Sequence, residues 1–240
     1  MKTPPRPLRA MSREATSEYQ MLSGRDSRSQ ELLRVMRISR EFIRGFRALH
    51  HIGPCITFFG ASRFGEDHAY YEPSRQLAQR VAELGFNIIT GGGPGLMEAA
   101  NRGARAAGTV SIGATIDISD EPPNRFVDRR IAFHYFFARK VTLVKYSYGF
   151  VMLPGGMGTL DELFEAVTLI QTGRLSDFPV ILYGTEYWQG LVDWLRDVPL
   201  AKGAFSEAQL ARIRLTDDND EIVDRLARLA RQLDLQPVRR

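Results

Sequence analysis

The stretch FVMLPGGMGTLDELFEAVTLIQTG, residues 150–173, shows how this chain is organised. It opens with an apolar run, Phe150–Leu153, which is typical of a strand that is covered on both faces of a sheet. A turn with three glycines follows, and Leu160–Thr172 has the length and spacing of a helix that ends at Gly173. The stretch therefore predicts a strand, a glycine-rich turn and a helix in immediate succession.

The same succession recurs upstream, where Phe86–Thr90 leads through GGGPG, residues 91–95, into a helix at Leu96–Ala107. Further strands are predicted at Cys55–Phe59, Val110–Ile116, Pro179–Tyr183 and Ile213–Leu215, and further helices at Gln30–His50, Tyr70–Leu84, Ile131–Tyr146, Tyr187–Arg196 and Asp220–Gln232. Strands that alternate with helices of this length pair in parallel through right-handed crossovers. We therefore predict an α/β fold with a Rossmann-like, open, mainly parallel sheet, helices on both faces and an extra N-terminal helix.

Composition narrows the classes of function. The chain has 240 residues, a net charge of +4 and a single cysteine, Cys55, which forms no internal disulfide. The expected setting is reducing and cytoplasmic. No basic stripe with interleaved aromatic residues indicates nucleic-acid binding, and no apolar run approaches the roughly 18 residues of a membrane-spanning helix. We expect neither a nucleic-acid nor a membrane partner.

Both glycine-rich turns lie where an open α/β sheet binds its ligands, beyond the carboxyl ends of the strands. Glycine lets the backbone approach a ligand closely, and the first amides of the following helix carry the positive end of the helix dipole. This arrangement favours an anion such as a phosphate.

Other interpretations of these turns stay open. Strand-to-helix turns use glycine for structural reasons, and Thr159 and Glu162 have the spacing of a helix capping box. Neither turn continues into the Gly-Lys-Ser/Thr of a Walker loop, whereas NAD binding remains an alternative because Asp117 follows the third predicted strand.

Taken in their order along the chain, the two turns resemble those of the LONELY GUY (LOG) family of phosphoribohydrolases. Pro154–Glu162 is similar to that family's PGGxGTxxE motif, Gly91–Met97 to its glycine-rich turn ending in Gly-Leu-Met, and Arg139-Lys140 to its Arg-Lys pair. The segments YFFARK, residues 135–140, and TLIQTG, residues 168–173, resemble the longer bacterial branch. The resemblance covers about residues 54–200.

The resemblance implies hydrolysis of the N-glycosidic bond of a cytokinin-type or purine nucleoside 5′-monophosphate, which gives a free base and ribose 5-phosphate. It implies no metal or organic cofactor, and a homodimer or higher homo-oligomer. Members are often labelled lysine decarboxylases, but the sequence has no recognisable setting for a Schiff-base lysine with a pyridoxal partner. The chain then divides into a flexible tail at 1–28, a helix at 29–52 and a nucleotide-binding catalytic domain at 53–240.

The resemblance also implies roles for individual residues. Glu162 would stabilise the developing cation at the ribose and orient or deprotonate water, and Arg139 would hold that carboxylate and a substrate oxygen. The implied substrate-binding residues are Ser62, Gly91, Gly92, Gly93, Gly95, Met97, Lys140, Gly155, Gly156, Gly158 and Thr159.

One segment departs from the family pattern. Shorter members have Gly-Val-Ile-Pro after the third strand, where this chain has GATID at residues 113–117, so Asp117 and Glu121 become candidates for a nearby acidic role. A non-catalytic nucleotide sensor of the same fold and an NAD(P)-dependent oxidoreductase are the alternative functions. The joint presence of Arg139 and Glu162 favours the hydrolase, whereas the preferred base and the role of residues 1–50 stay open.

Overall fold

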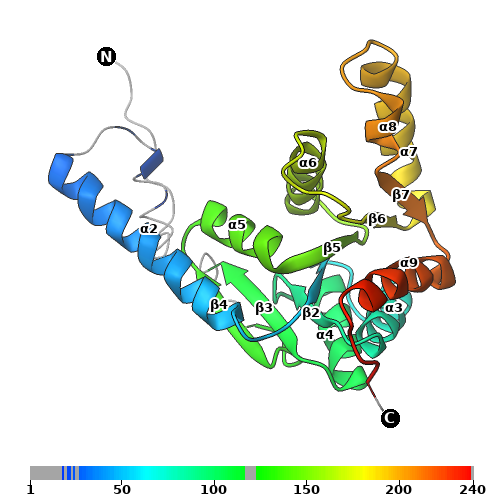
Figure 1. The fold of residues 1–240 in the computed structure, drawn as a ribbon, viewed down its shortest axis with the longest axis horizontal. Coiled ribbons are helices and arrows are strands. Elements are labelled where there is room, and N and C mark those ends of the chain that lie inside the picture. The colour runs from blue at the N-terminus through cyan, green and yellow to red at the C-terminus, as the bar shows by residue number, and fades with distance from the viewer. Residues whose placement is uncertain (1–17, 19–20, 23, 25–26, 117–122, 239–240) are drawn as a thin grey trace.

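The computed structural model describes residues 18, 21–22, 24, 27–116 and 123–238, and in this part of the chain all strands join one parallel sheet (Figure 1). The strand order is β4-β3-β2-β1-β5-β6-β7. The strands are β1 Cys55–Phe59, β2 Asn87–Thr90, β3 Ser111–Ile116, β4 Arg129–Phe133, β5 Ser147–Met152, β6 Val180–Tyr183 and β7 Ile213–Thr216. The chain moves outward from β1 to β4 and then returns beside β1, so the order reverses between β1 and β5. Ligands of open α/β sheets bind at the carboxyl ends of strands at such a point.

Helices cover both faces of the sheet, which confirms the predicted fold class (Figure 1). One core packs α3, α4 and α9 against one face, and a second core packs α2, α5, α6 and α7 against the other. The helices are α2 Arg28–Leu49, α3 Tyr71–Glu83, α4 Leu96–Ala107, α5 Phe136–Tyr146, α6 Met157–Gln171, α7 Thr185–Leu195, α8 Glu207–Leu210 and α9 Asn219–Gln232. Within β1, Ile56 and Phe58 belong to the first core and Cys55 and Phe59 to the second, as the alternation of a strand requires.

The N-terminal helix α2 begins after Ser27, whose side chain forms a capping box with Gln30. It packs against α5 and β4, and its Leu49 joins the second core. The helix was predicted from the helical spacing of six apolar residues. Four of them, Leu32, Leu33, Met36 and Ile43, are exposed, whereas Phe46 is half-buried and Leu49 is buried. Most of the tail that was predicted to be flexible, residues 1–28, lies outside the described residues.

The predicted helix at Ile131–Tyr146 is wrong in its first part. The chain forms strand β4 at Arg129–Phe133, pairs it with β3, and starts α5 only at Phe136. The side chains of Ile131 and Phe133 are buried, whereas Arg130 is exposed and Ala132 is half-buried. This period of two belongs to a strand at the sheet edge, and it is too short to stand out beside the aromatic residues that follow.

Candidate active site

The glycine-rich motif at residues 154–159 forms the turn after β5 and the first residues of α6. The helix begins at Met157, with Gly156 in the N-cap position, so its first amides face the end of the sheet. A Cβ on Gly155 would collide with the Thr159 side chain, which therefore lies directly against the turn. In contrast, a Cβ on Gly156 or Gly158 would meet no atom within 4 Å, so the backbone is open there.

The capping box proposed for Thr159 and Glu162 is wrong. The helix starts two residues earlier than Thr159, whose backbone amide already donates to the Gly156 carbonyl at 3.0 Å. Thr159 thus lies inside the first turn, and Glu162 is left for another role.

The turn after β2 contains two positions that only glycine can occupy. Gly92 and Gly95 have φ of +75° and +70°, and a Cβ on Gly95 would lie 2.5 Å from the Ala61 carbonyl oxygen. The Asn124 side chain donates to the carbonyl oxygens of Gly92 at 3.2 Å and Gly93 at 2.9 Å. This part of the motif therefore shapes the loop, and Asn124, which no sequence motif pointed to, holds the loop in place.

The two turns and the end of β1 enclose a cleft of about 680 Å³. Its lining residues are Phe59, Gly60, Ala61, Ser62, Arg63, Phe64, Gly91, Met97, Phe136, Arg139, Gly155, Gly156, Met157, Gly158, Thr159 and Tyr187. Most of the predicted site residues are in this set, but Gly92, Gly93, Gly95, Lys140 and Glu162 are not. The volume falls within the range of small-molecule sites, about 300–1,000 Å³.

Arg139 connects the cleft to Glu162. Arg139, one turn into α5, lines the cleft, and its Nη2 lies 3.5 Å from Oε1 of Glu162, which α6 carries. The Glu162 side chain is 1 % exposed and the Arg139 side chain 16 %. Among the described residues, Arg139 Nε and Glu162 Oε2 are buried without hydrogen-bond partners. A buried polar atom without a partner costs about 1–3 kcal/mol, so two such atoms beside a cleft indicate groups kept for a ligand.

Burial also changes the ionisation of this pair. It raises the pKa of Glu162 to about 7, although the Arg139 charge opposes the rise. It lowers the pKa of Arg139, although the Glu162 carboxylate opposes the fall. A carboxyl group with a pKa near neutrality can exchange a proton during a reaction at physiological pH.

The raised pKa of Glu162 predicts a pH-dependent stability. A group whose folded pKa exceeds its unfolded value of 4.5 stabilises the fold below pH 4.5 and loses that contribution as the pH rises through 7. From pH 5 to pH 8 the loss is about 2–3 kcal/mol. Because glutamine does not titrate, Glu162→Gln should remove this part of the pH dependence. The free energy of unfolding, measured by denaturant titration at pH 5 and pH 8, tests this. An equal change in that free energy between the two pH values for both proteins would contradict the raised pKa.

Lys140 lies next to Arg139 but serves the protein itself in this structure. Its Nζ contacts Oδ1 of Asp161 at 2.9 Å and Oε2 of Glu165 at 3.0 Å. Burial alone would lower the pKa of Lys140, but these two carboxylates raise it. The family resemblance implies that Lys140 binds the substrate, but Lys140 does not line the cleft here.

Besides Phe59 at the end of β1, three more aromatic residues of the cleft were not selected from the sequence as site residues. Phe64, Phe136 and Tyr187 line it, and the Tyr187 hydroxyl donates to the Gly155 carbonyl at 2.9 Å. The rings of Phe64 and Tyr187 lie edge to face, with centroids 6.5 Å apart. None of the three belongs to a glycine motif, so only their position in the fold identifies them. Asp117 and Glu121 lie outside the described residues.

Among the described residues, no helix is long and apolar enough to span a membrane. No group of three or more histidine, cysteine, aspartate or glutamate side chains in the described ranges is placed to hold a metal ion.

Known proteins resemble this chain in sequence and in fold. The chain is 31 % identical to the Escherichia coli K12 pyrimidine/purine nucleotide 5′-monophosphate nucleosidase over 156 residues, which are 59 % of this chain but only 34 % of that protein. It is 30 % identical to the Mycobacterium tuberculosis cytokinin riboside 5′-monophosphate phosphoribohydrolase over 151 residues, 61 % of this chain and 80 % of that one. The chain thus spans about a third of the length of the first relative.

The solved structures agree on the fold. A molybdenum cofactor binding protein from Rippkaea orientalis superposes with a TM-score of 0.55 at 22 % identity, covering 73 % of this chain and 96 % of that one. At this identity the likeness concerns the fold alone. A family model described as "possible lysine decarboxylase" matches residues 97–226, more than half of the chain. Together with the two glycine-rich turns and their relatives, this match shows that the chain belongs to the LOG family.

Proposed function

We propose that this protein hydrolyses the N-glycosidic bond of a purine or cytokinin-type nucleoside 5′-monophosphate. The observation that carries the proposal is the buried Arg139–Glu162 pair beside a cleft bounded by two glycine-rich turns. The names of the relatives, a nucleotide 5′-monophosphate nucleosidase and a cytokinin riboside 5′-monophosphate phosphoribohydrolase, support the same class of reaction.

The 5′-phosphate fits the turn after β5. The first amides of α6 and the Thr159 hydroxyl face the cleft there, and the open backbone at Gly156 and Gly158 leaves room for phosphate oxygens. With the phosphate on this turn, the ribose lies toward Gly91 and Arg139. The base then contacts the apolar part of the cleft, which includes Phe64 and Tyr187.

The reaction breaks the bond between ribose C1′ and the base nitrogen while a water oxygen bonds to C1′. Positive charge develops on the ribose as the bond breaks. The ionised Glu162 carboxylate stabilises this charge or takes a proton from the water, and the base leaves with the bonding electrons and takes up the proton that the water loses. The 3.5 Å contact between Arg139 and Glu162 is long for a catalytic hydrogen bond, and such contacts commonly tighten when the substrate binds.

The family description as a possible lysine decarboxylase would require pyridoxal phosphate on a neutral lysine, and the described lysines do not fit that group. Lys140 is held by two carboxylates that raise its pKa, which keeps it charged. Lys145 and Lys202 are exposed and do not line the cleft. A Schiff base needs the uncharged amine, so we do not assign that activity.

The test is base release from AMP and isopentenyladenosine monophosphate, compared with the matching nucleosides, followed by chromatography with no metal added. Release from the monophosphates alone supports both the reaction and the phosphate site, and the relative rates identify the base. Tight nucleotide binding without release from any of these compounds would favour a non-catalytic nucleotide-binding protein instead.

The phosphate site makes a separate prediction at Gly156. Its backbone is extended and a side chain there would point into open space, so Gly156→Val should fold normally but fill the place of the phosphate. We expect KM for the monophosphate to rise by about tenfold or more. The matched control is Gly190→Val, a change at an exposed glycine of α7 where a Cβ also meets nothing within 4 Å. Equal KM values for the two variants would place the phosphate elsewhere.

A further inference from the structure

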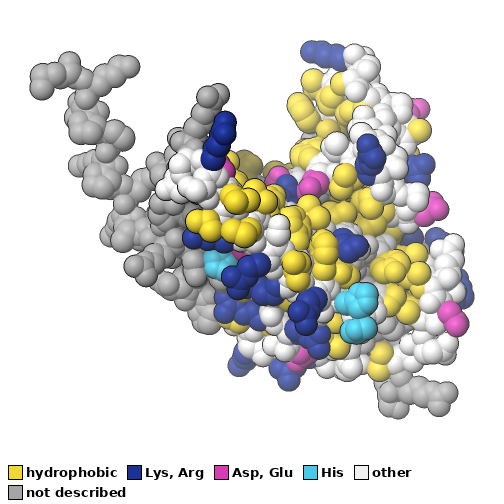
Figure 2. Space-filling view, turned by 60° about the vertical axis from the view of Figure 1, so that its left-hand side comes forward, with side chains coloured by type: hydrophobic (Ala, Val, Ile, Leu, Met, Phe, Trp, Pro, Cys, Tyr) yellow, Lys and Arg dark blue, Asp and Glu magenta, His cyan; other side chains and the backbone are white. Residues whose placement is uncertain are grey.

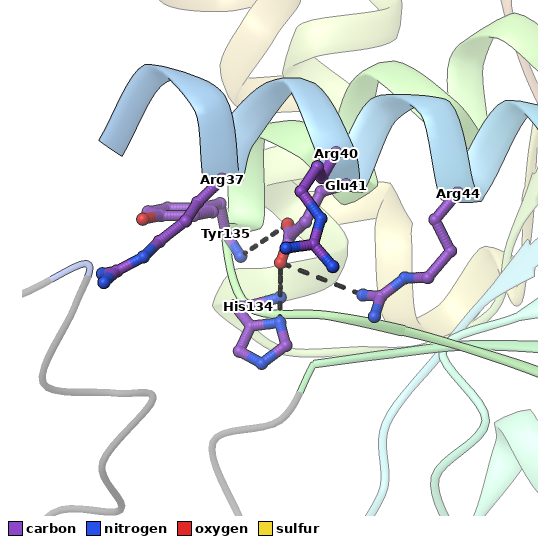
Figure 3. Close-up of a pocket in the computed structure, with 6 residues that line it drawn as sticks. All are labelled: Arg37, Arg40, Glu41, Arg44, His134 and Tyr135. Atoms are coloured by element: carbon purple, nitrogen blue, oxygen red, sulfur yellow. Dashed lines mark hydrogen bonds and ion pairs between the residues drawn. The ribbon is translucent and has the colours of Figure 1, made fainter. Parts of the chain in front are cut away.

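A second pocket lies between α2 and the loop that joins β4 to α5 (Figure 3). Its volume is about 280 Å³, and its lining residues are Arg37, Arg40, Glu41, Arg44, His134 and Tyr135. None of these residues lines the active-site cleft. The proposed hydrolysis uses none of them, so the pocket needs its own explanation.

Three arginines make one wall of this pocket. Arg37, Arg40 and Arg44 are spaced three and four residues apart, which places them on one face of α2. Figure 3 shows Arg40 and Arg44 reaching from the helix toward His134, while Arg37 extends to the side, past Tyr135. Lys and Arg side chains also gather on the face of the molecule shown in Figure 2. Arg44 donates to the Ala132 carbonyl oxygen and lies 3.9 Å from Glu41. Arg37 and Arg40 have no ion-pair partner among the described residues.

The acidic groups nearby are already engaged. Glu41 is buried, and its Oε1 accepts hydrogen bonds from the backbone amide and Nδ1 of His134, both at 2.7 Å, while Oε2 accepts from the Tyr135 amide at 3.2 Å. Glu18 accepts from the Phe136 amide at 3.3 Å, so it also lies at the start of α5. Among the described residues, three guanidinium groups stand against these two carboxylates, which gives this part of the pocket a net positive charge.

Tyr135 places an unpartnered hydroxyl group at the same pocket. Its side chain is 2 % exposed, and its hydroxyl is buried without a hydrogen-bond partner among the described residues. The same residue lines the pocket. Buried hydroxyl groups normally have a partner, so the donor of this one is unused; it is closed to solvent here and meets an acceptor oxygen only when a bound molecule displaces its neighbours.

We propose that this pocket binds the phosphate group of a small molecule, at a site separate from the cleft. A guanidinium group matches phosphate through paired hydrogen bonds, and the oxygens of a phosphate also accept from the Tyr135 hydroxyl. A volume of about 280 Å³ is small for a ligand site and suits a compact phosphate ester better than a nucleotide. A ligand held here contacts the start of α5, the helix that carries Arg139 to the cleft.

The test measures binding by calorimetry on the full chain carrying Gly156→Val, which suppresses phosphate binding in the cleft. The probes are inorganic phosphate, ribose 5-phosphate and malonate, the last as a carboxylate dianion. We expect the phosphate probes to bind at one site, and the double change Arg37→Gln and Arg40→Gln to weaken that binding by about tenfold or more.

Two further variants separate this site from general charge effects. Arg47→Gln removes a positive charge from the same helix at a residue outside the pocket, and should leave the affinity unchanged. Tyr135→Phe keeps the ring and removes only the hydroxyl, so it should weaken phosphate binding severalfold. Equal affinities for the double variant and Arg47→Gln would overturn the proposal, and so would a preference for malonate over phosphate. Neither outcome depends on whether the protein releases a base.

Discussion

Replacing Glu162 by glutamine is expected to reduce kcat for base release by about 10²–10⁴-fold while KM changes little. Glutamine has nearly the same shape but carries no negative charge, so it neither stabilises a cation at the ribose nor accepts a proton from water. The unmodified protein should gain kcat/KM as the pH rises through about 7, because the ionised form of Glu162 is the active one. The variant should lack that rise. Initial rates of base release between pH 5 and pH 9 measure both effects.

The matched control for this prediction is Glu165→Gln. It makes the same chemical change one turn further along α6, at a residue that contacts Lys140 and does not line the cleft. Its activity should stay close to that of the unmodified protein. Because the Glu165 charge helps to raise the pKa of Glu162, the pH midpoint should move slightly downward. Full turnover by Glu162→Gln would show that another group carries the reaction.

The parts of the fold that could be predicted from sequence are those that a single local pattern determines. The buried strands β1, β2, β3 and β6 are near-continuous apolar runs, and glycines at 85, 108 and 173 mark the ends of helices. Strand β4 could not be found in this way because only Ile131 and Phe133 point inward at the sheet edge. The position of β5 beside β1 is likewise a property of the whole sheet rather than of either strand.

The candidate site was also predictable only in part. The two turns could be located from their glycines, since a close approach of the backbone requires glycine at those positions. The structure separates their roles: Gly92 and Gly95 shape the loop, whereas Gly156 and Gly158 border open space. Phe64 reaches the cleft from the loop after β1, Phe136 from α5 and Tyr187 from α7, so their contribution depends on the tertiary fold. The pocket between α2 and the loop that joins β4 to α5 could not be predicted from sequence for the same reason, and β4 itself was not predicted.

Replacing Arg139 by glutamine is expected to reduce kcat/KM by about 10²–10³-fold and to shift the pH profile toward alkaline values. Arg139 lines the cleft, and its guanidinium group contacts Glu162. Its removal therefore takes away a donor to the substrate and also a charge that lowers the pKa of Glu162. A midpoint that starts near 7 should therefore move higher. The same assays of base release across pH measure both the rate and the midpoint.

Arg139→Lys tests which property of the arginine matters. Lysine keeps a positive charge, so the midpoint should stay nearer to 7, but it lacks the planar fork that can hold a carboxylate and a substrate oxygen together. Its rate should therefore remain well below that of the unmodified protein. Arg174→Gln removes an exposed arginine outside the cleft and controls for the loss of one positive charge. A rate loss in Arg139→Gln without any shift of the midpoint would mean that Arg139 supports the fold of the cleft rather than the ionisation of Glu162.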